Sequence, residues 1–525
     1  MKHRPAIGVV VAALVSSAFS ACVGDDPVLP ASAVDDAGSV DGAGAETAPG
    51  DAASTTDGPD SGEDPGPPPA STGTLSWAAA VVGDNVSGNS VAFDGLGNVF
   101  VGGGYLSSTV IDFGNGNTLP ANTGSYDGYI AKFNATGLCQ WAVALTGTGV
   151  GDRVVIALAA APGGEVAFVA DTQSSTVKLD KAAVPGLGGS DVTVGQLDPS
   201  GSQKWLHVFG SANGESPQAI AVDATGRVAI AGTYIRNTNT DIAFDGITAN
   251  PPQSPNGQTF VAILDASGTA KSLKAFTVGN AIDAGVSRSM PHALAFDPSG
   301  NLVVGGEFYG SLETHAGEAS SKSYTSAGQN DAWIAEIDLQ NKTKWSVAFG
   351  LAGADSIHGV ASDSQGNVYA TFGYQGNVVV TKTPLPTFGI GDVGIARFDA
   401  TGTILGANGY GSVMNEVPTN IAVDRWNEVI VSGLMNGDVD FGKPAMAYGG
   451  GDGFVAKLSP TSAGLWAYGI GSSAIDDEAN SVAVDKAGNV AISGKVQPNP
   501  AASILGKGFV IPAGKSAAFV AVTSP

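Results

Sequence analysis

The sequence predicts an all-β fold built from seven repeats of four antiparallel strands. The 525 residues include 75 glycines and 28 prolines, and only 14% are charged, a composition that favours turns and short strands over long helices. A segment with the pattern apolar-Ala-apolar-Asp, followed by a short turn and Gly-Asn-Val, recurs along the chain, and its apolar residues alternate as in a half-buried strand. The copies of this segment cover residues 91–94, 158–161, 220–223, 294–297, 360–363, 421–424 and 482–485.

Each repeat predicts four short strands, which we label a to d. In the first repeat, strand a ends at Asp94, a tight turn leads to strand b at 98–102, and a longer connection leads to strand c at 129–133. A second turn leads to strand d. Tryptophans mark one common position of strand d in five repeats, and Ser272 and Gly406 take that position in the other two; the tryptophans are Trp77, Trp141, Trp205, Trp345 and Trp466.

The two ends of the repeat region complement each other. The last repeat stops after its strand c at 519–522, and the first repeat is preceded by an additional strand d at 75–78. We therefore expect the N-terminal strand to complete the last repeat and to close a ring. Radially repeated four-stranded antiparallel sheets form a β-propeller, in which the strand edges are short and protected. The predicted architecture is a seven-bladed β-propeller over residues 73–525, closed by its N-terminal strand in the last blade.

The N-terminal segment has the features of an export signal. Lys2 and Arg4 precede an uncharged apolar run at 6–21, which ends at Cys22. This end resembles the lipobox of bacterial lipoproteins, although Phe19 departs from the usual aliphatic residue, and it implies a signal peptide at 1–21 and a lipid anchor on Cys22. Ordinary cleavage after Ser20 is the alternative.

Residues 22–72 are expected to form an acidic, disordered tether. Positions 23–72 contain 11 Asp or Glu and no Lys or Arg, so the segment has too little apolar surface to offset the entropy of ordering it. Val23 follows the anchor cysteine, and the sorting pattern that this resembles implies the outer membrane or the cell surface. A periplasmic or secreted protein is the alternative location.

The repeat as a whole resembles the bacterial SBBP-type β-propeller repeat. The resemblance covers residues 73–525, is closest at 481–485 with Gly488-Asn489-Val490, and is weakest in the second repeat, where Ala161 replaces Asp and Glu165 replaces Asn. It implies a secreted or lipid-anchored surface protein, and it indicates the fold more than the function.

Charge and motifs exclude several classes of function. The formal net charge of −24 opposes contact with phosphate backbones, so we expect no nucleic-acid partner. Two cysteines, Cys22 and Cys139, are too few for a disulfide framework or a structural zinc site. The sequence also contains no Gly-x-Ser-x-Gly, His-Glu-x-x-His, phosphate-loop or dinucleotide-binding motif.

One position of strand a predicts a ring of polar side chains. His292 and His358 both lie five residues before the Asp of their strand a. Because strand a is the innermost strand of a propeller blade, these side chains should surround the mouth of the central channel. Five other repeats have Asn89, Ile156, Gln218, Thr419 and Asn480 there, so the candidate ligand-binding residues are Asn89, Gln218, His292, His358, Thr419 and Asn480.

The same face carries many carboxylates. The d–a loops contain Asp84, Asp152, Glu215, Asp283, Asp355, Glu416 and Asp477, and strand c is preceded by Asp127, Asp191, Asp331, Asp392 or Asp452. One interpretation is a cation site, with Ca²⁺ as the cofactor and Asp84, Asp127, Asp355, Asp392, Asp452 and Asp477 as ligands. The other is that these carboxylates bond local backbone N–H groups and stabilise turns. Residues 237–241 resemble half of a calcium loop, but Ile242 replaces the required glycine.

These observations favour a binding protein over an enzyme. The longest connections, 233–258 and 278–291, lie on the His292 face, and variable loops on a rigid scaffold commonly carry specificity. We expect a monomeric, non-catalytic binding or scaffold module of the bacterial envelope, with a protein or glycan ligand. The alternatives are a polysaccharide lyase or glycosidase that uses rim carboxylates and His292, and a purely structural spacer.

Overall fold

The computed structural model describes the propeller and a few residues before it. The described residues are 66–149, 151–173, 175–236, 242–249, 254–278, 287–315, 318, 322–473, 477–497, 502–509, 511–512 and 515–525. The expected signal peptide at 1–21, the anchor Cys22, most of the tether, the segment 237–241 and Asp283 lie outside them. The described part of the chain contains strands and turns but no helix, and so none that could span a membrane.

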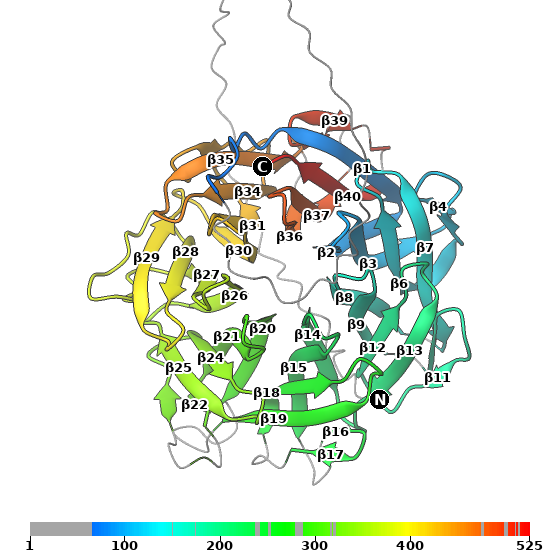
Figure 1. Cartoon of the computed structure of the whole chain (residues 1–525), viewed down its shortest axis with the longest axis horizontal. Helices are drawn as coiled ribbons and strands as arrows, with labels where there is room; N and C mark the ends of the chain where they lie inside the picture. Colours follow the sequence, from blue (N-terminus) through cyan, green and yellow to red (C-terminus); the bar gives the residue numbers. More distant parts are fainter. Residues whose placement is uncertain are drawn as a thin grey trace, which may run out of the picture. The chain divides into compact units, whose positions relative to one another are not determined.

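Seven antiparallel sheets surround a central axis, as predicted (Figure 1). From the axis outward, blade 1 consists of β2 (Asn85–Phe93), β3 (Val99–Ser107), β6 (Asn122–Phe133) and β7 (Cys139–Thr148), and blade 2 of β8 (Arg153–Ala160), β9 (Val166–Thr172), β12 (Asp191–Leu197) and β13 (Gln203–Phe209). In the same order, blade 3 consists of β14 (Glu215–Val222), β15 (Val228–Arg236), β18 (Ser254–Leu264) and β19 (Ala270–Val278), and blade 4 of β20 (Arg288–Phe296), β21 (Leu302–Tyr309), β24 (Asp331–Ile337) and β25 (Thr343–Phe349). Blade 5 consists of β26 (Ser356–Ser362), β27 (Val368–Tyr374), β28 (Asp392–Phe398) and β29 (Ile404–Tyr410). Blade 6 consists of β30 (Glu416–Val423), β31 (Val429–Met435), β34 (Asp452–Leu458) and β35 (Gly464–Gly471). Blade 7 consists of β36 (Glu478–Val484), β37 (Val490–Val496), β40 (Ser516–Thr523) and β1 (Leu75–Gly83).

The N-terminal strand closes the ring, as the complementary ends of the repeat region predicted. β1 pairs antiparallel with β40 from Leu75 opposite Thr523 to Gly83 opposite Ser516, and the two strands lie side by side in Figure 1. Backbone hydrogen bonds from Thr72 N to Pro525 O, at 2.9 Å, and from Ser524 N to Thr74 O, at 2.8 Å, continue the contact beyond the strands. The two ends of the propeller therefore form one sheet.

Three sheets have six strands, where the sequence predicted four. In these, a hairpin from the b–c connection of one blade pairs with the outermost strand of the preceding blade: β10 with β7, β22 with β19, and β38 with β35. The hairpins cover unpaired N–H and C=O groups at a sheet edge. Every b–c connection except that of blade 5 contains a hairpin. The hairpin strands are β4 (Ile111–Asp112), β5 (Thr118–Leu119), β10 (Thr176–Lys178), β11 (Val184–Pro185), β16 (Ala243–Phe244), β17 (Ile247–Thr248), β22 (Ser311–Glu313), β23 (Ser323–Thr325), β32 (Val439–Asp440), β33 (Pro444–Ala445), β38 (Ala502–Ile504) and β39 (Lys507–Phe509).

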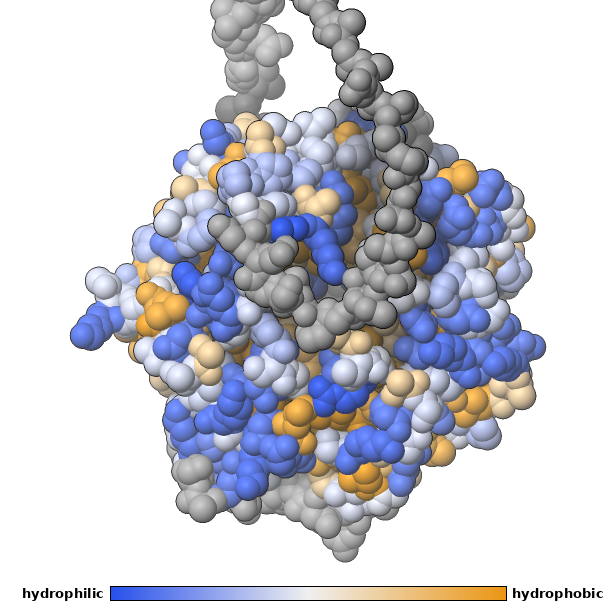
Figure 2. Space-filling model, viewed as in Figure 1, coloured by the Kyte–Doolittle hydropathy of each residue, from blue (hydrophilic) through white to orange (hydrophobic). Residues whose placement is uncertain are grey.

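The hydrophobic core lies between blades. Each cluster of buried side chains combines residues of two adjacent blades; Phe100 and Ile130 of blade 1, for example, pack with Val155 and Leu158 of blade 2. The cluster between blades 7 and 1 joins Val520 of the last strand to Val91 of the first blade. On the face shown in Figure 2, apolar residues form separate patches among hydrophilic ones. Each blade thus depends on its neighbours for burial of its apolar faces.

The strand-d tryptophans form a second contact between blades. In the c–d turn of the following blade, a glycine with positive φ packs against the indole ring, and a Cβ at Gly137 would lie 2.6 Å from the ring of Trp77. The other turn glycines are Gly201 with Trp141, Gly268 with Trp205, and Gly402 with Trp345. In blade 7, where strands c and d are not joined by a turn, Gly73 just before β1 packs against Trp466 in the same way. At the other two junctions Ser272 and Gly406 replace the tryptophan. The turn residue is Asn341 at the Ser272 junction and Ser462 at the Gly406 junction, and both also have positive φ.

The contact between Gly137 and Trp77 can be tested by Gly137→Val. The added side chain would collide with the indole, so we expect the variant to lose about 1–3 kcal/mol of unfolding free energy beyond the cost of its positive φ. Gly116→Val is the matched control, because Gly116 has a similar φ, 79° against 82° for Gly137, and no atom within 4 Å of its added Cβ. Equal losses for the two variants in urea unfolding would contradict the contact.

Candidate functional site

The predicted ring residues occupy one equivalent position in all blades, and each is the extra residue of a β-bulge. In β2 the pairing with β3 skips Asn89, and in β20 the pairing with β21 skips His292. A bulged residue has no partner across the ladder, and the bulge re-aims its side chain. The full set of bulged residues is Asn89, Ile156, Gln218, His292, His358, Thr419 and Asn480, and all are half-buried on the innermost strands.

Several ring residues bond from one blade to the next. Asn89 donates from Nδ2 to the carbonyl of Val155, at 2.9 Å, and Thr419 donates from Oγ1 to the carbonyl of Ala479, at 2.6 Å. Asn480 donates to the carbonyl of Gly88, at 3.3 Å, across the closure of the ring. Each acceptor precedes the bulged residue of the following blade. Gln218 differs, because it bonds Ser216 of its own strand, at 3.2 Å.

His292 and His358 form the most distinctive part of the ring. Their imidazoles stack with centroids 5.4 Å apart and an interplanar angle of 13°. Burial lowers the pKa of His358 to about 3, and the neighbouring His292 acts in the same direction. Protonation of His358 is therefore suppressed at neutral pH.

A carboxylate on the next strand completes this cluster. Oε2 of Glu307 lies 3.9 Å from Nε2 of His292. Burial would raise the pKa of Glu307, but His292, His358 and Arg288 together lower it, so the carboxylate stays ionised. Asn330 fixes its direction by donating to Oε1 at 2.8 Å, and Arg288 donates to Asn330 at 2.9 Å. We call Arg288, His292, Glu307, Asn330 and His358 the axial cluster.

The rim carboxylates recur as pairs at blade junctions. The aspartate that begins strand c of one blade approaches the acid at or just before the start of strand a of the next. At Gly210, both Asp191 Oδ1 and Glu215 Oε2 lie within 3 Å of the position that a Cβ would take, at 2.4 and 2.9 Å. The pairs are Asp191 with Glu215, Asp331 with Asp355, Asp392 with Glu416, and Asp452 with Asp477, and each residue is at most 5% exposed.

These paired carboxylates accept hydrogen bonds from their own loops. Phe388 N donates to Asp392 at 3.0 Å, Leu351 N donates to Asp355 at 3.1 Å, and Ser472 N donates to Asp477 at 2.7 Å. Burial raises the pKa of Asp355 and of Asp477 to about 6, and the partner carboxylate adds to the effect. The contacts are those expected of turn stabilisers.

The six candidate calcium ligands do not converge. Asp84 pairs with Lys515, which holds its pKa well below the usual range, and Asp127 pairs with Arg153 at 3.1 Å. Asp355, Asp392, Asp452 and Asp477 belong to the carboxylate pairs described above. Within the described ranges, no three His, Cys, Asp or Glu side chains are grouped to hold a metal ion.

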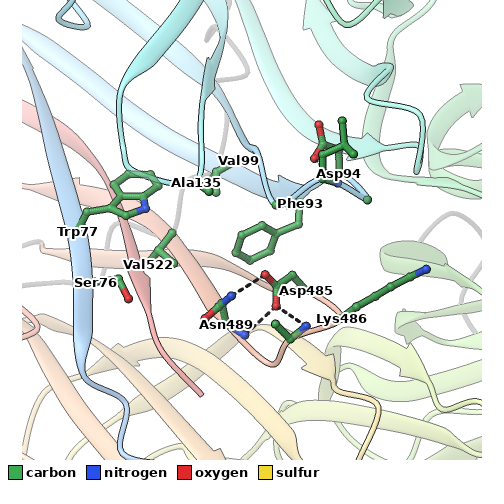
Figure 3. A pocket seen from close by; sticks show the side chains of 14 residues that line it. Ser76, Trp77, Phe93, Asp94, Val99, Ala135, Asp485, Lys486, Asn489 and Val522 are labelled. Carbon is green, nitrogen blue, oxygen red and sulfur yellow. Dashed lines mark hydrogen bonds between the residues drawn. The ribbon is translucent and has the colours of Figure 1, made fainter. Parts of the chain in front are cut away.

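Sequence reasoning missed a pocket on the opposite face, between blades 7 and 1 (Figure 3). It has a volume of 370 Å³ and is lined by Trp77, Phe93, Asp94, Asp485 and Val522, among others. Val522 pairs with Trp77 across the sheet. At the equivalent position, Lys132 pairs with the tryptophan of blade 1 and Lys457 with that of blade 6. The short side chain leaves space beside the indole. This departure from the repeat was visible in the sequence.

Comparison with known proteins does not assign the chain to a family. No family model and no curated protein matches the chain. Solved structures that resemble it are puromycin hydrolase, with 10% identity over 82% of this chain and 54% of that chain and a TM-score of 0.41, and the calcium-binding protein regucalcin from Agrobacterium tumefaciens, with 10% identity over 69% and 85% and a TM-score of 0.29. A glucose dehydrogenase has 11% identity over 68% and 96% and a TM-score of 0.29. The chain spans about half the length of the puromycin hydrolase chain, and similarity at this level carries no argument about function.

Asp477→Asn should change how stability depends on pH. The pKa of Asp477 is about 6 in the folded state against 3.8 for a free side chain, so the folded protein loses stability as the pH rises through 6. The variant lacks this ionisation, and its unfolding free energy should fall less between pH 5 and pH 8, by about 1–2 kcal/mol. Ser472→Ala keeps both carboxyl groups but removes a hydrogen bond that lowers the pKa of Asp477, so its pH dependence should be at least as steep as that of the unmodified protein.

The same variant separates the two interpretations of the carboxylate pairs. About 5 mM CaCl₂ would fill a calcium site of extracellular type. If it raised the thermal midpoint of the unmodified protein but not that of Asp477→Asn, the pair of Asp452 and Asp477 would be a cation site. We expect no such difference.

Proposed function

We propose that the protein is a non-catalytic binding module of the bacterial envelope, whose axial cluster contacts a polar ligand, either a glycan or a protein segment. The axial cluster is the observation that carries the proposal. It places two imidazole faces, a carboxylate and a guanidinium within one small part of the axial rim. Such a set offers donors, acceptors and flat surfaces, the features by which a preformed site orients a polar ligand.

The rest of the rim supports a scaffold role. The other polar ring residues and the carboxylate pairs are engaged in contacts between blades and within loops, which hold the rim rigid. Rigid sites lose little conformational entropy when a ligand binds. We propose a monomer without a resident cofactor and without nucleic-acid contacts, in agreement with the net charge of −24.

A binding panel tests this function. Labelled protein should bind at least one envelope polysaccharide, peptidoglycan fragment or envelope protein, and the double variant His292→Ala/His358→Ala should weaken that binding about tenfold or more. His207→Ala, on the outer strand β13, is the matched control and should bind as the unmodified protein does. Absence of binding to the whole panel would contradict the proposal and favour a structural spacer.

The same panel tests the enzymatic alternative, which the close approach of His292 and Glu307 favours. Release of unsaturated or reducing sugar ends by the unmodified protein, but not by His292→Ala, would assign a polysaccharide-cleaving activity. We expect no product with either protein.

We also propose that Cys22 carries the lipid anchor, that residues 1–21 are removed, and that 22–72 tether the propeller to the outer membrane. Intact-mass analysis of protein from its native host should show an acylated N-terminal cysteine, and Cys22→Ser should move the protein from the membrane to the soluble fraction. Protease treatment of intact cells should remove the propeller if it faces outward. An unmodified N-terminus after Ser20 would contradict the anchor.

A further inference from the structure

A second pocket lies between blades 5 and 6, where the repeat lacks its tryptophan. At five junctions an indole ring fills the space between the outermost strand and the c–d turn of the following blade. At this junction the residue is Gly406, and a Cβ added to it would meet no atom within 4 Å. A pocket of 220 Å³ lies here, lined by Tyr369, Arg397, Gly406, Asn408 and Ser462, among others. The space that an indole ring occupies at the other five junctions is therefore left as a pocket here.

The other junction without an indole is built differently. It has Ser272 in place of the tryptophan, and its turn residue Asn341 reaches back to the outermost strand, where its Nδ2 donates to the carbonyl of Leu273 at 3.1 Å. Between blades 5 and 6 the turn residue is the shorter Ser462, whose hydroxyl accepts from Asn408 at 2.8 Å. Tyr410 donates to the carbonyl of Ser462 at 3.2 Å. These contacts hold the turn in place while the space beside Gly406 stays open.

The lining combines aromatic and cationic groups. Arg397 is the one charged residue among those that line the pocket, in a chain with a net charge of −24. Its guanidinium lies 5.4 Å from the ring of Tyr369, which is 2% exposed. Within the described part of the chain, Nε of Arg397 has no hydrogen-bond partner, so a ligand does not have to displace one from that nitrogen. The hydroxyl of Tyr369 lies next to the carboxylate of Asp363, and burial together with this carboxylate raises the pKa of Tyr369.

Size and chemistry together limit the ligand. A protein cavity of about 150 Å³ can bind benzene, so the larger pocket accommodates a two-ring system. The five filled junctions show that an indole fits between the corresponding strand and turn. A carboxylate on such a ring would accept from Arg397, and charged hydrogen bonds are the stronger ones.

We propose that this pocket binds a small molecule with a flat, indole-sized aromatic ring and a carboxylate, with the ring in the place of the missing tryptophan and the carboxylate on Arg397. The pocket is on the face of the c–d turns, away from the d–a and b–c loops. The site is therefore independent of the axial cluster, and its test does not depend on the ligand of that cluster.

Titration of the whole protein with indole-3-acetate and with indole, followed by ligand-detected NMR, tests the proposal. We expect saturable binding of indole-3-acetate with a Kd of about 1 mM or tighter, as the size of the ligand allows, and weaker binding of indole. Arg397→Gln should weaken indole-3-acetate about tenfold and change indole less than twofold.

A filled variant provides the decisive comparison. Gly406→Trp/Ser462→Gly restores the pair found at the other junctions and should abolish binding of both probes. Its matched control, Ser272→Trp/Asn341→Gly, makes the same exchange between blades 3 and 4 and should bind as the unmodified protein does. A thermal midpoint for the filled variant at or above that of the unmodified protein would show that the indole has been accepted.

Two results would overturn the proposal. One is no saturable binding of either probe to the unmodified protein. The other is equal binding to the unmodified protein and to a folded filled variant. If Arg397→Gln binds both probes as the unmodified protein does, the pocket takes an aromatic ring but the carboxylate assignment is wrong.

Discussion

The pairing of β1 with β40 is the constraint on which the rest of the structure depends. Among the described residues no blade has a core of its own, because each cluster of apolar side chains is shared by two neighbours. If β1 left the last blade, the edge of β40 would be exposed, and the contact between Trp77 and Gly137 would be lost with it. Gly73 and Ser71, which precede β1, contact Trp466 of blade 6, so the same short segment joins three consecutive blades. Closure is thus a long-range contact that substitutes for disulfides in a chain with two cysteines.

Departures from the repeat locate the distinctive sites of this propeller. A device that recurs in nearly all blades, such as the aspartate at the a–b turn of six of the seven, is explained by the needs of the fold. Asp94, Asp363 and Asp485 each accept hydrogen bonds from the amides of their own turn and from the side chain of a following asparagine. The pockets lie instead where one blade breaks the pattern, at Val522 and at Gly406. At both places a smaller side chain stands where other blades have a larger one, and space is left beside buried polar groups.

The sequence was sufficient for the architecture and for the position of the ring, but not for the chemistry of the site. Counting five residues back from the strand-a aspartate identified the ring, because the bulge occurs at the same place in every blade. The bulge itself was not predictable, since one unpaired residue does not disturb the alternation of apolar residues enough to be seen. Glu307 and Arg288 were missed because their approach to His292 depends on how two strands pair and twist. The edge hairpins were missed because strands of two or three residues give almost no periodic signal.

One strand-c position explains why an acidic protein can offer a site for an anion. Lys132 lies 3.5 Å from Asp94, and Lys457 is buried within 3.0 Å of Asp424 and 2.8 Å of Glu428, so carboxylates neutralise both lysines. Arg397 has the same register against its strand d, yet its guanidinium lies over the ring of Tyr369 instead. An aromatic face attracts a cation less strongly than a carboxylate in direct contact does, and Arg397 lines the pocket beside Gly406. Surface carboxylates farther away than about 8 Å are screened by physiological salt, so the local arginine, and not the net charge of the chain, determines which ligand this pocket attracts.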